Sequence, residues 1–333
     1  MVDALATAWF VIIGFCIMMY VLLDGMDLGI GILFPFFPDR NDRNIMVSTI
    51  LPVWDGNQTW LVLGTASLYG AFPTAFSLLL PALYMPIFIM VIALLFRGIT
   101  FEFRLKTKTL QNLWDNLFFL SSAVIAFSQG LLLGTFVEGF EFGSSPDTLN
   151  YTLFTPFNIA CGIALLFGYS LLGATWVIGK TDGKLQKKMF SIANLCLIVV
   201  AFFLMVISIW SPFIDSHIWQ TWFNPKYIYK LALLPFVTSC LILYCLFSIY
   251  KKREYVLFWL CIGIFLCSYA GVGISTWPYI VPHLITFWQA SASGSSLLFM
   301  LFGGLLLLPV LLGYTLYSYY IFRGKVKEVI GYH

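Results

Sequence analysis

The sequence predicts an all-α, polytopic membrane protein with nine transmembrane helices. Of its 333 residues, 60% are hydrophobic and only 10% are charged, and the mean hydropathy is +0.91. A soluble globular protein of this length carries far more charge on its surface. The long apolar runs can cross a bilayer as helices, which satisfy their own backbone hydrogen bonds there. The loops between them are too short for a soluble domain.

We treat residues 1–333 as a single membrane domain, because no long polar stretch divides the apolar runs. A spanning helix needs about 20 mainly apolar residues. The predicted helices cover 8–33, 48–70, 74–97, 115–137, 156–178, 190–210, 229–250, 255–275 and 296–322. Only a short turn, residues 70–73, separates the second predicted helix from the third.

The basic residues predict how the chain is oriented. With nine helices, all but two of the 18 Lys and Arg residues fall on one side of the membrane, the exceptions being Lys226 and Lys230. Lys and Arg are enriched in cytoplasmic loops. We therefore expect the N-terminus outside and the C-terminus in the cytoplasm. Lys108 and Lys327 would face the cytoplasm, and the acidic loop that contains Asp147 would face outwards.

Three acidic residues interrupt the first two helices near their predicted cytoplasmic ends: Asp24, Asp27 and Asp55. A carboxylate at membrane depth costs several kcal/mol unless it is paired, hydrated or protonated, so it is a candidate functional residue. At about 1.5 Å per residue, Asp27 and Asp55 lie roughly 10 Å from the cytoplasmic face, and Asp24 about 15 Å. Asp24 and Asp27 share one helix face. We therefore expect one acid cluster that opens to the cytoplasm.

The segment around Asp55 adds polar side chains that suit a proton path. Gln58 and Thr59 share the helix face of Asp55, and Asn57 is close in sequence. Gly29 and its neighbouring glycines in the first helix would let a partner helix, or water, approach closely. Carboxylates in a low-dielectric environment are suited to pass on protons near neutral pH. The functional interpretation is a proton inlet formed by the three acids with support from these polar neighbours.

A structural interpretation of the acids stands beside the functional one. The carboxylates can cap helices, bond to nearby tryptophan indoles, or pair with Arg97 at the cytoplasmic end of the third helix. We interpret Arg97 itself as an end residue that reaches for the membrane surface. Glu102 is expected to pair with Arg104 at the interface. Asp115 is expected to cap the fourth helix, where a negative charge suits the helix dipole.

The sequence offers no evident redox centre. Its three histidines are His217 and His283, in predicted outer loops, and the terminal His333. A haem needs an axial His, Met or Cys inside the fold. The sequence shows no metal-ligand cluster and no phosphate-binding glycine loop, and its seven cysteines fit packing positions. We expect this chain to bind no cofactor, metal or nucleic acid, and we place redox chemistry on a partner.

Several segments carry a family resemblance. Residues 24–29 read DGMDLG and residues 54–60 read WDGNQTW, and residues 96–104 and 112–115 add weaker matches. These segments resemble subunit II of the cytochrome bd-type quinol oxidases, and WDGN is the most specific of them. The resemblance covers nearly the whole chain and is strongest over 20–140. The short length of the chain and the amino-acid sequence of residues 28–37 most resemble members of the cyanide-insensitive branch of the family.

The resemblance implies nine helices arranged as two four-helix bundles and one peripheral helix. It implies a haem-free subunit in a bacterial inner membrane, packed against a subunit I that carries two haems b, one haem d and the quinol site. Such a complex oxidises quinol, reduces dioxygen to water and takes its protons from the cytoplasm. Asp55 matches the family acid assigned to the proton path, and Asp24 and Asp27 match acids of the first helix. The resemblance also leaves room for lipid, for a structural quinone in subunit II and for a small single-helix accessory subunit.

Two other classes of protein share some of these features. A proton-coupled secondary transporter also has buried acids and glycine-interrupted helices, but it usually needs a polar cavity at mid-membrane, where this chain has few polar residues. A purely structural subunit would use the acids only to bond to their neighbours. A haem-bearing partner that copurifies with the chain favours the oxidase over both.

Overall fold

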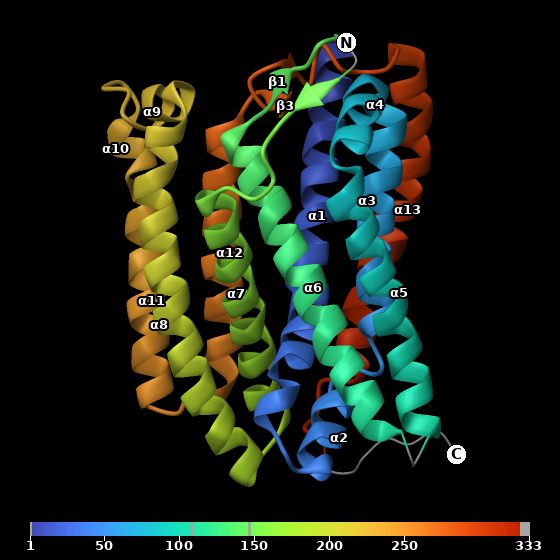
Figure 1. The fold of residues 1–333 in the computed structure, drawn as a ribbon, viewed down its shortest axis with the longest axis vertical. Coiled ribbons are helices and arrows are strands. Elements are labelled where there is room, and N and C mark those ends of the chain that lie inside the picture. Colours follow the sequence, from blue (N-terminus) through green and yellow to red (C-terminus); the bar gives the residue numbers. More distant parts are fainter. Residues whose placement is uncertain (1, 108–109, 146–147, 327–333) are drawn as a thin grey trace.

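The computed structural model describes residues 2–107, 110–145 and 148–326, and Lys108, Asp147, Lys327 and His333 lie outside these ranges. The described chain is almost entirely helical, with two short two-stranded sheets at one end (Figure 1). The helices are α1 (Val2–Leu33), η1 (Phe34–Phe36), α2 (Arg40–Ser48), α3 (Trp54–Ala71), α4 (Pro73–Ala82), α5 (Tyr84–Lys106), α6 (Gln111–Glu138), α7 (Pro156–Lys180), α8 (Gly183–Ile214), α9 (Ser216–Trp222), α10 (Ile228–Leu231), α11 (Leu233–Tyr250), α12 (Glu254–Thr276) and α13 (Gly294–Ile321). The sheets pair β1 (Glu141–Phe142) with β2 (Leu149–Asn150), and β3 (Tyr279–Val281) with β4 (Ile285–Thr286).

The described helices give eight to nine candidate membrane spans, in agreement with the nine that the sequence predicts. Eight are each long and apolar enough to span a membrane, and α3 with α4 passes the same test as one segment bent by 119°. The predicted start of the third helix at residue 74 is wrong, because α4 bends aside and the spanning helix α5 begins at Tyr84. Phe72 leaves helical geometry (φ −131°, ψ 62°), and Pro73, which has no backbone N–H, begins α4. The second span also begins later than predicted, at Trp54.

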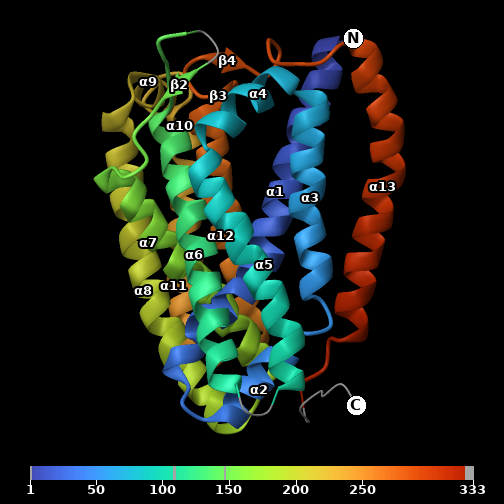
Figure 2. The ribbon, with the colours of Figure 1, turned by 45° about the vertical axis from the view of Figure 1, so that its right-hand side comes forward.

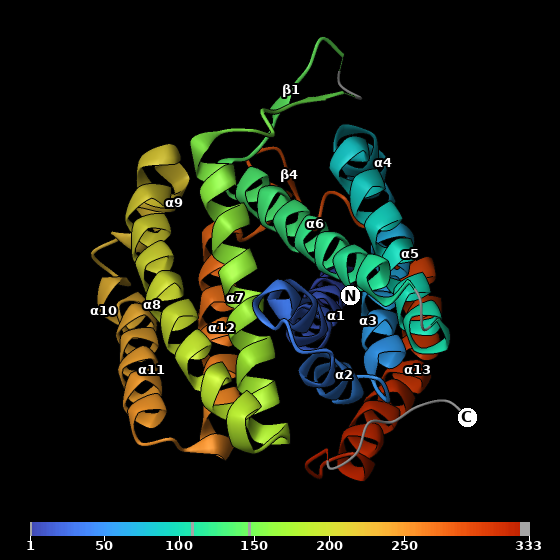
Figure 3. The same cartoon turned by 60° about the horizontal axis from the view of Figure 1, so that its bottom comes forward.

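The long helices form two four-helix bundles with one peripheral helix, as the family resemblance implies. One bundle contains α1, α3, α5 and α6, and the other contains α7, α8, α11 and α12 (Figures 1 and 3). Helix α13 lies outside both and packs against α1 and α3. We call the end that carries α2 and the end of α13 the inner end, which the basic loops predict to be cytoplasmic. The two small sheets lie at the opposite, outer end.

The inner third of α1 is the most enclosed part of the fold. Every residue from Asp24 to Phe34 is buried. Here α1 crosses α7 very closely: a Cβ atom on Gly29 would collide with the Tyr169 carbonyl, and one on Gly173 would collide with the α1 backbone. Two facing glycines thus permit direct backbone packing. This crossing joins the two bundles and surrounds the acids of α1 with protein.

We expect Gly29→Ala to destabilise the protein, because the added methyl group has no space at the α1–α7 crossing. Overpacking of this kind typically costs about 1–3 kcal/mol. The measurement is the thermal unfolding midpoint of the purified complex in detergent. Gly313→Ala in α13 is the matched control, since a Cβ there meets nothing within 4 Å. Equal midpoints for Gly29→Ala and Gly313→Ala would contradict the close crossing.

Candidate functional site

A buried ion pair joins α1 to α5. The Arg97 guanidinium donates from Nη1 to Oδ2 of Asp24 at 2.8 Å and from Nη2 to Oδ1 at 2.5 Å, and both side chains are 0% exposed. Such bidentate pairs are among the strongest charge-assisted hydrogen bonds. The pairing of an acid with Arg97, weighed as the structural interpretation, is confirmed for Asp24.

Arg97 is therefore not the surface-seeking end residue that the sequence predicted. Because α5 begins at Tyr84 rather than near residue 74, Arg97 lies about 20 Å along the helix, at roughly 1.5 Å per residue. It also precedes the last residue of α5, Lys106, by more than two turns. The late start of α5 thus moves Arg97 from the predicted membrane surface to the interior.

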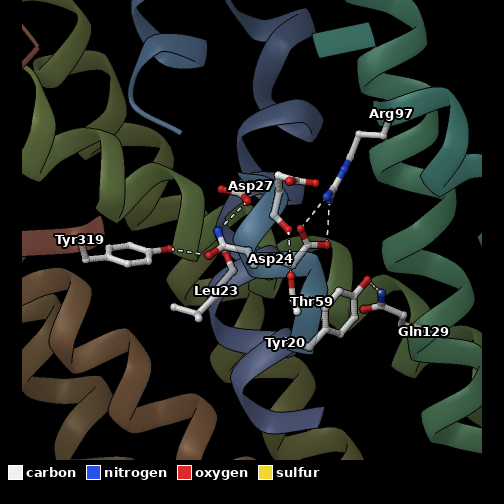
Figure 4. A network of polar contacts seen from close by, with 10 residues as sticks. Tyr20, Leu23, Asp24, Asp27, Thr59, Arg97, Gln129 and Tyr319 are labelled. Carbon is white, nitrogen blue, oxygen red and sulfur yellow. Dashed lines mark hydrogen bonds and ion pairs between the residues drawn. The ribbon is translucent and has the colours of Figure 1, made fainter. Parts of the chain in front are cut away.

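A second set of contacts joins α1, α3 and α13 around Asp27 (Figure 4). Asn57 donates from Nδ2 to Oδ2 of Asp27 at 2.8 Å and to the Leu23 carbonyl oxygen at 3.3 Å. The Tyr319 hydroxyl donates to Oδ1 of Asn57 at 3.1 Å. Asp27 is 0% exposed, and its Oδ1 accepts no hydrogen bond from any described residue. Asp27 thus has an amide partner but no direct counter-ion.

A third group of polar side chains lies beside Asp24. Gln129 of α6 donates from Nε2 to the Tyr20 hydroxyl at 2.8 Å, and the Tyr169 hydroxyl of α7 donates to Oε1 of Gln129 at 2.5 Å. Tyr20 is one helical turn from Asp24 on α1, and Figure 4 shows Tyr20 and Gln129 below the acid. The buried polar cluster therefore draws on both bundles and on α13.

Asp55 lies apart from the other two acids, so the expected cluster of three is wrong. Its side chain is exposed in the first turn of α3, and no described residue gives it a hydrogen bond or an ion pair. The reason is helical geometry: residues two apart point in nearly opposite directions. Because Asn57 points at Asp27, Asp55 must point away from α1. The expected proximity of α1 and α3 is nevertheless confirmed by the Asn57 bonds.

The two other polar residues predicted near Asp55 have different surroundings. Thr59 is partly buried and donates only to the backbone carbonyl of Asp55, at 3.5 Å. Gln58 has a buried Nε2 without a hydrogen-bond partner among the described residues. A buried donor of this kind is a position where water can bind.

A separate ionic cluster fixes the inner end. Asp115 accepts from Arg104 Nε at 2.5 Å and from Arg43 Nη1 at 2.7 Å. Asp115 is therefore a counter-ion and not the predicted helix cap, because α6 starts four residues earlier, at Gln111. The predicted Glu102–Arg104 pair is also wrong, since Glu102 pairs with Lys106 across one exposed turn, at 3.4 Å.

Sequence reasoning missed Tyr20, Gln129, Tyr169 and Tyr319. Each lies in a separate apolar helix, far apart in sequence, and tyrosines are common at helix ends for interfacial reasons. Gln129 carried the one usable signal, as a primary amide inside the apolar run of α6. Among the described residues, no three His, Cys, Asp or Glu side chains are grouped so as to hold a metal ion.

Known proteins are similar to this chain in sequence and in fold. The family model described as cytochrome bd terminal oxidase subunit II matches residues 5–322. Cytochrome bd-I ubiquinol oxidase subunit 2 of Escherichia coli (strain K12) is 25% identical, covering 98% of this chain and 96% of that protein. Cytochrome bd ubiquinol oxidase subunit 2 of Bacillus subtilis (strain 168) is 27% identical, covering 96% of each. A chain in the solved structure of bd oxidase from Geobacillus thermodenitrificans shares the fold, with a TM-score of 0.76 and 19% identity over 96% of this chain and 99% of that one.

We expect loss of one member of the Arg97–Asp24 pair to be more destabilising than loss of both. Arg97→Met leaves the Asp24 carboxylate buried without its counter-ion, which typically costs about 3–5 kcal/mol. Replacing both, as Asp24→Leu with Arg97→Met, is expected to recover most of that loss, because an apolar pair has no charge to desolvate. Thermal unfolding of the purified complex measures both effects.

The control for this comparison is Lys106→Met, which removes the exposed partner of Glu102. Exposed pairs contribute about 0–1 kcal/mol, so this variant should unfold close to the wild-type temperature. A double variant no more stable than Arg97→Met alone would argue against a simple buried ion pair.

Proposed function

The chain belongs to the cytochrome bd terminal oxidase subunit II family, and we propose that it forms a proton-delivery path beside the haem-bearing subunit of such an oxidase. It is one subunit of a quinol oxidase complex, which is an oxidoreductase, and a multi-pass protein of the bacterial inner membrane. Its implied partner is subunit I of the oxidase. Family membership does not favour the alternative of a proton-coupled transporter.

The exposed carboxylate of Asp55 is the observation that carries this proposal. Helix α3, whose first turn contains Asp55, begins above α2 and not at the innermost end of the bundle (Figure 2), and this supports a position for Asp55 at membrane depth. A charged group facing lipid there is costly, and such groups normally face protein or water. Val62 and Tyr69 extend the exposed surface of α3 towards the outer end. We infer that subunit I covers this surface and that Asp55 lies at the boundary between the two subunits.

Asp24 and Asp27 differ in whether they have a counter-ion, and we infer different roles for them from this difference. One guanidinium serves two acids there, and it is committed to both oxygens of Asp24. A second buried carboxylate without a counter-ion is strongly disfavoured and tends to take up a proton instead. We therefore assign Asp24 as the fixed counter-ion of Arg97, and Asp27 as the group that holds and releases a proton, at Oδ1.

The first turns of α3 connect the two acids. Asp55 and Asn57 are on opposite sides of the helix, one facing the proposed subunit boundary and the other bonded to Asp27. The unpartnered Nε2 of Gln58 marks a place for water between these sides, and Thr59 adds a hydroxyl one turn further on. In this proposal protons from the inner end reach subunit I through Asp27, bound water and Asp55, while the rest of the chain is scaffold.

Electron transfer is assigned to subunit I, where the family implies haem b and haem d. Both described histidines of this chain lie at the outer end (Figure 1), but only His283 is in a loop, between β3 and β4, since His217 belongs to the short helix α9. Nε2 of His283 lies 2.6 Å from Oδ2 of Asp215. These residues do not supply an axial ligand inside a helical bundle. A structural quinone, lipid and a small accessory subunit remain expectations of the family resemblance.

We expect Asp55→Asn to lower quinol oxidase turnover by at least about tenfold while the complex assembles with its haems. The amide keeps the size of the side chain but cannot carry a proton, and loss of a positioned proton-transfer group typically costs 10²–10⁴-fold in rate. Oxygen consumption by the purified complex, with the haem absorption spectrum, measures turnover and assembly together.

Glu102→Gln is the matched control, because Glu102 is another exposed acid of the inner half and pairs only with Lys106. It should leave turnover unchanged. Unchanged turnover and proton uptake in Asp55→Asn would refute the proposed path. Loss of haem from that variant would point to a structural role for Asp55 instead.

A further inference from the structure

Asn57 is held in one orientation by three contacts from two sides. Its amide nitrogen faces two acceptors of α1, the Leu23 carbonyl and the Asp27 carboxylate, and its oxygen faces the Tyr319 hydroxyl. The opposite orientation would put the amide oxygen against the Leu23 carbonyl, which can only accept. In the observed orientation the amide donates to Asp27, and a donor stabilises the ionised form of a carboxyl group. The Asn57 amide therefore favours release of the Asp27 proton.

Tyr319 is placed by contacts that the rest of α13 does not share. Most of α13 is exposed in this chain, with only Leu297 and Thr315 buried, although the helix packs against α1 and α3. The Tyr319 ring packs edge-on against Trp176 of α7, with 5.6 Å between ring centroids. Its hydroxyl reaches Asn57 on the other side.

The inner end of α13 is tied to the second bundle by a short polar strap, residues 322–326. Lys180 of α7 donates to the Phe322 carbonyl oxygen at 2.5 Å. Lys325 bridges Asp182 and Glu254, at 2.6 Å to each. Hydrogen bonds to these two acids raise the pKa of Lys325 above its usual value, so the strap stays charged at physiological pH. We infer that this attachment fixes the position of Tyr319 along the bundle axis, next to Asn57.

We propose that Tyr319 is a positioning residue that controls proton release from Asp27 by holding the Asn57 amide against it. The inference rests on the proposed role of Asp27 as a proton carrier. The titratable and charged groups that face Asp27 are Asp24 on its own helix, Arg97 from α5 and Tyr319 from α13. Tyr20 and Tyr169 have Asp24 as their neighbouring acid. Among the described residues, Tyr319 is the titratable group that reaches Asp27 through the Asn57 amide.

The test is an infrared pH titration of the protonated carboxyl band of the purified, haem-loaded complex. The band that disappears in Asp27→Asn identifies Asp27. Tyr319→Phe keeps the ring against Trp176 and removes only the hydroxyl. We expect its Asp27 band to persist to higher pH, by about one pH unit, the scale of one hydrogen bond. Tyr317→Phe is the matched control, because Tyr317 is exposed two residues away on the same helix.

A double variant separates positioning from a general disturbance of α13. In an Asn57→Ala background the hydroxyl has no amide to hold, so adding Tyr319→Phe should move the titration no further. A Tyr319→Phe titration identical to wild type would overturn the inference, whatever the turnover. An equal shift with and without Asn57 would overturn it too. The absence of any titrating Asp27 band would reject both this inference and the carrier role of Asp27, whereas the Asp55→Asn turnover test stands independently.

Discussion

The buried Arg97–Asp24 ion pair is the interaction on which the inner half of the structure depends. Two charges inside a membrane protein are tolerable only when each satisfies the other and lipid is kept away. The Gly29–Gly173 crossing does this by bringing α7 against α1, and the late start of α5 brings Arg97 to the right depth. The same pair leaves Asp27 without a counter-ion. The same arrangement of charges therefore stabilises the fold at the inner end and leaves Asp27 able to carry a proton in the proposed function.

Much of the fold follows from local sequence features. Apolar length predicts the nine crossings, and the glycines of α1 predict a close helix neighbour. The break at Leu83, between α4 and α5, was harder to predict than the turn before residue 74, because α4 is as apolar as the spanning helix that follows it. That difference of about ten residues changed the interpretation of Arg97, since it decides whether the side chain reaches the membrane surface or the interior. The depth of a side chain in the bundle thus depends on the residue at which its helix begins, and amino-acid composition does not reveal that residue.

The candidate site was predictable only in part. The acids were found because carboxylates are rare in apolar segments, but their grouping required knowing which face of α3 meets α1. Helical spacing allows either Asp55 or Asn57 to face α1, and only packing decides between them. The partners Tyr319 and Gln129 come from remote helices, so no local pattern points to them. In the proposed function this division separates a buried proton carrier, Asp27, from an acid at the subunit boundary, Asp55.

The most direct test of this account is proton uptake by the oxidase in liposomes, followed with a pH-sensitive dye on the side of the inner end during turnover. If Asp27 carries the proton, Asp27→Asn slows proton uptake and oxygen reduction together, and Asp27→Glu, which retains a carboxyl group, restores part of both rates. Wild-type uptake in Asp27→Asn would contradict the role of Asp27 as the proton carrier.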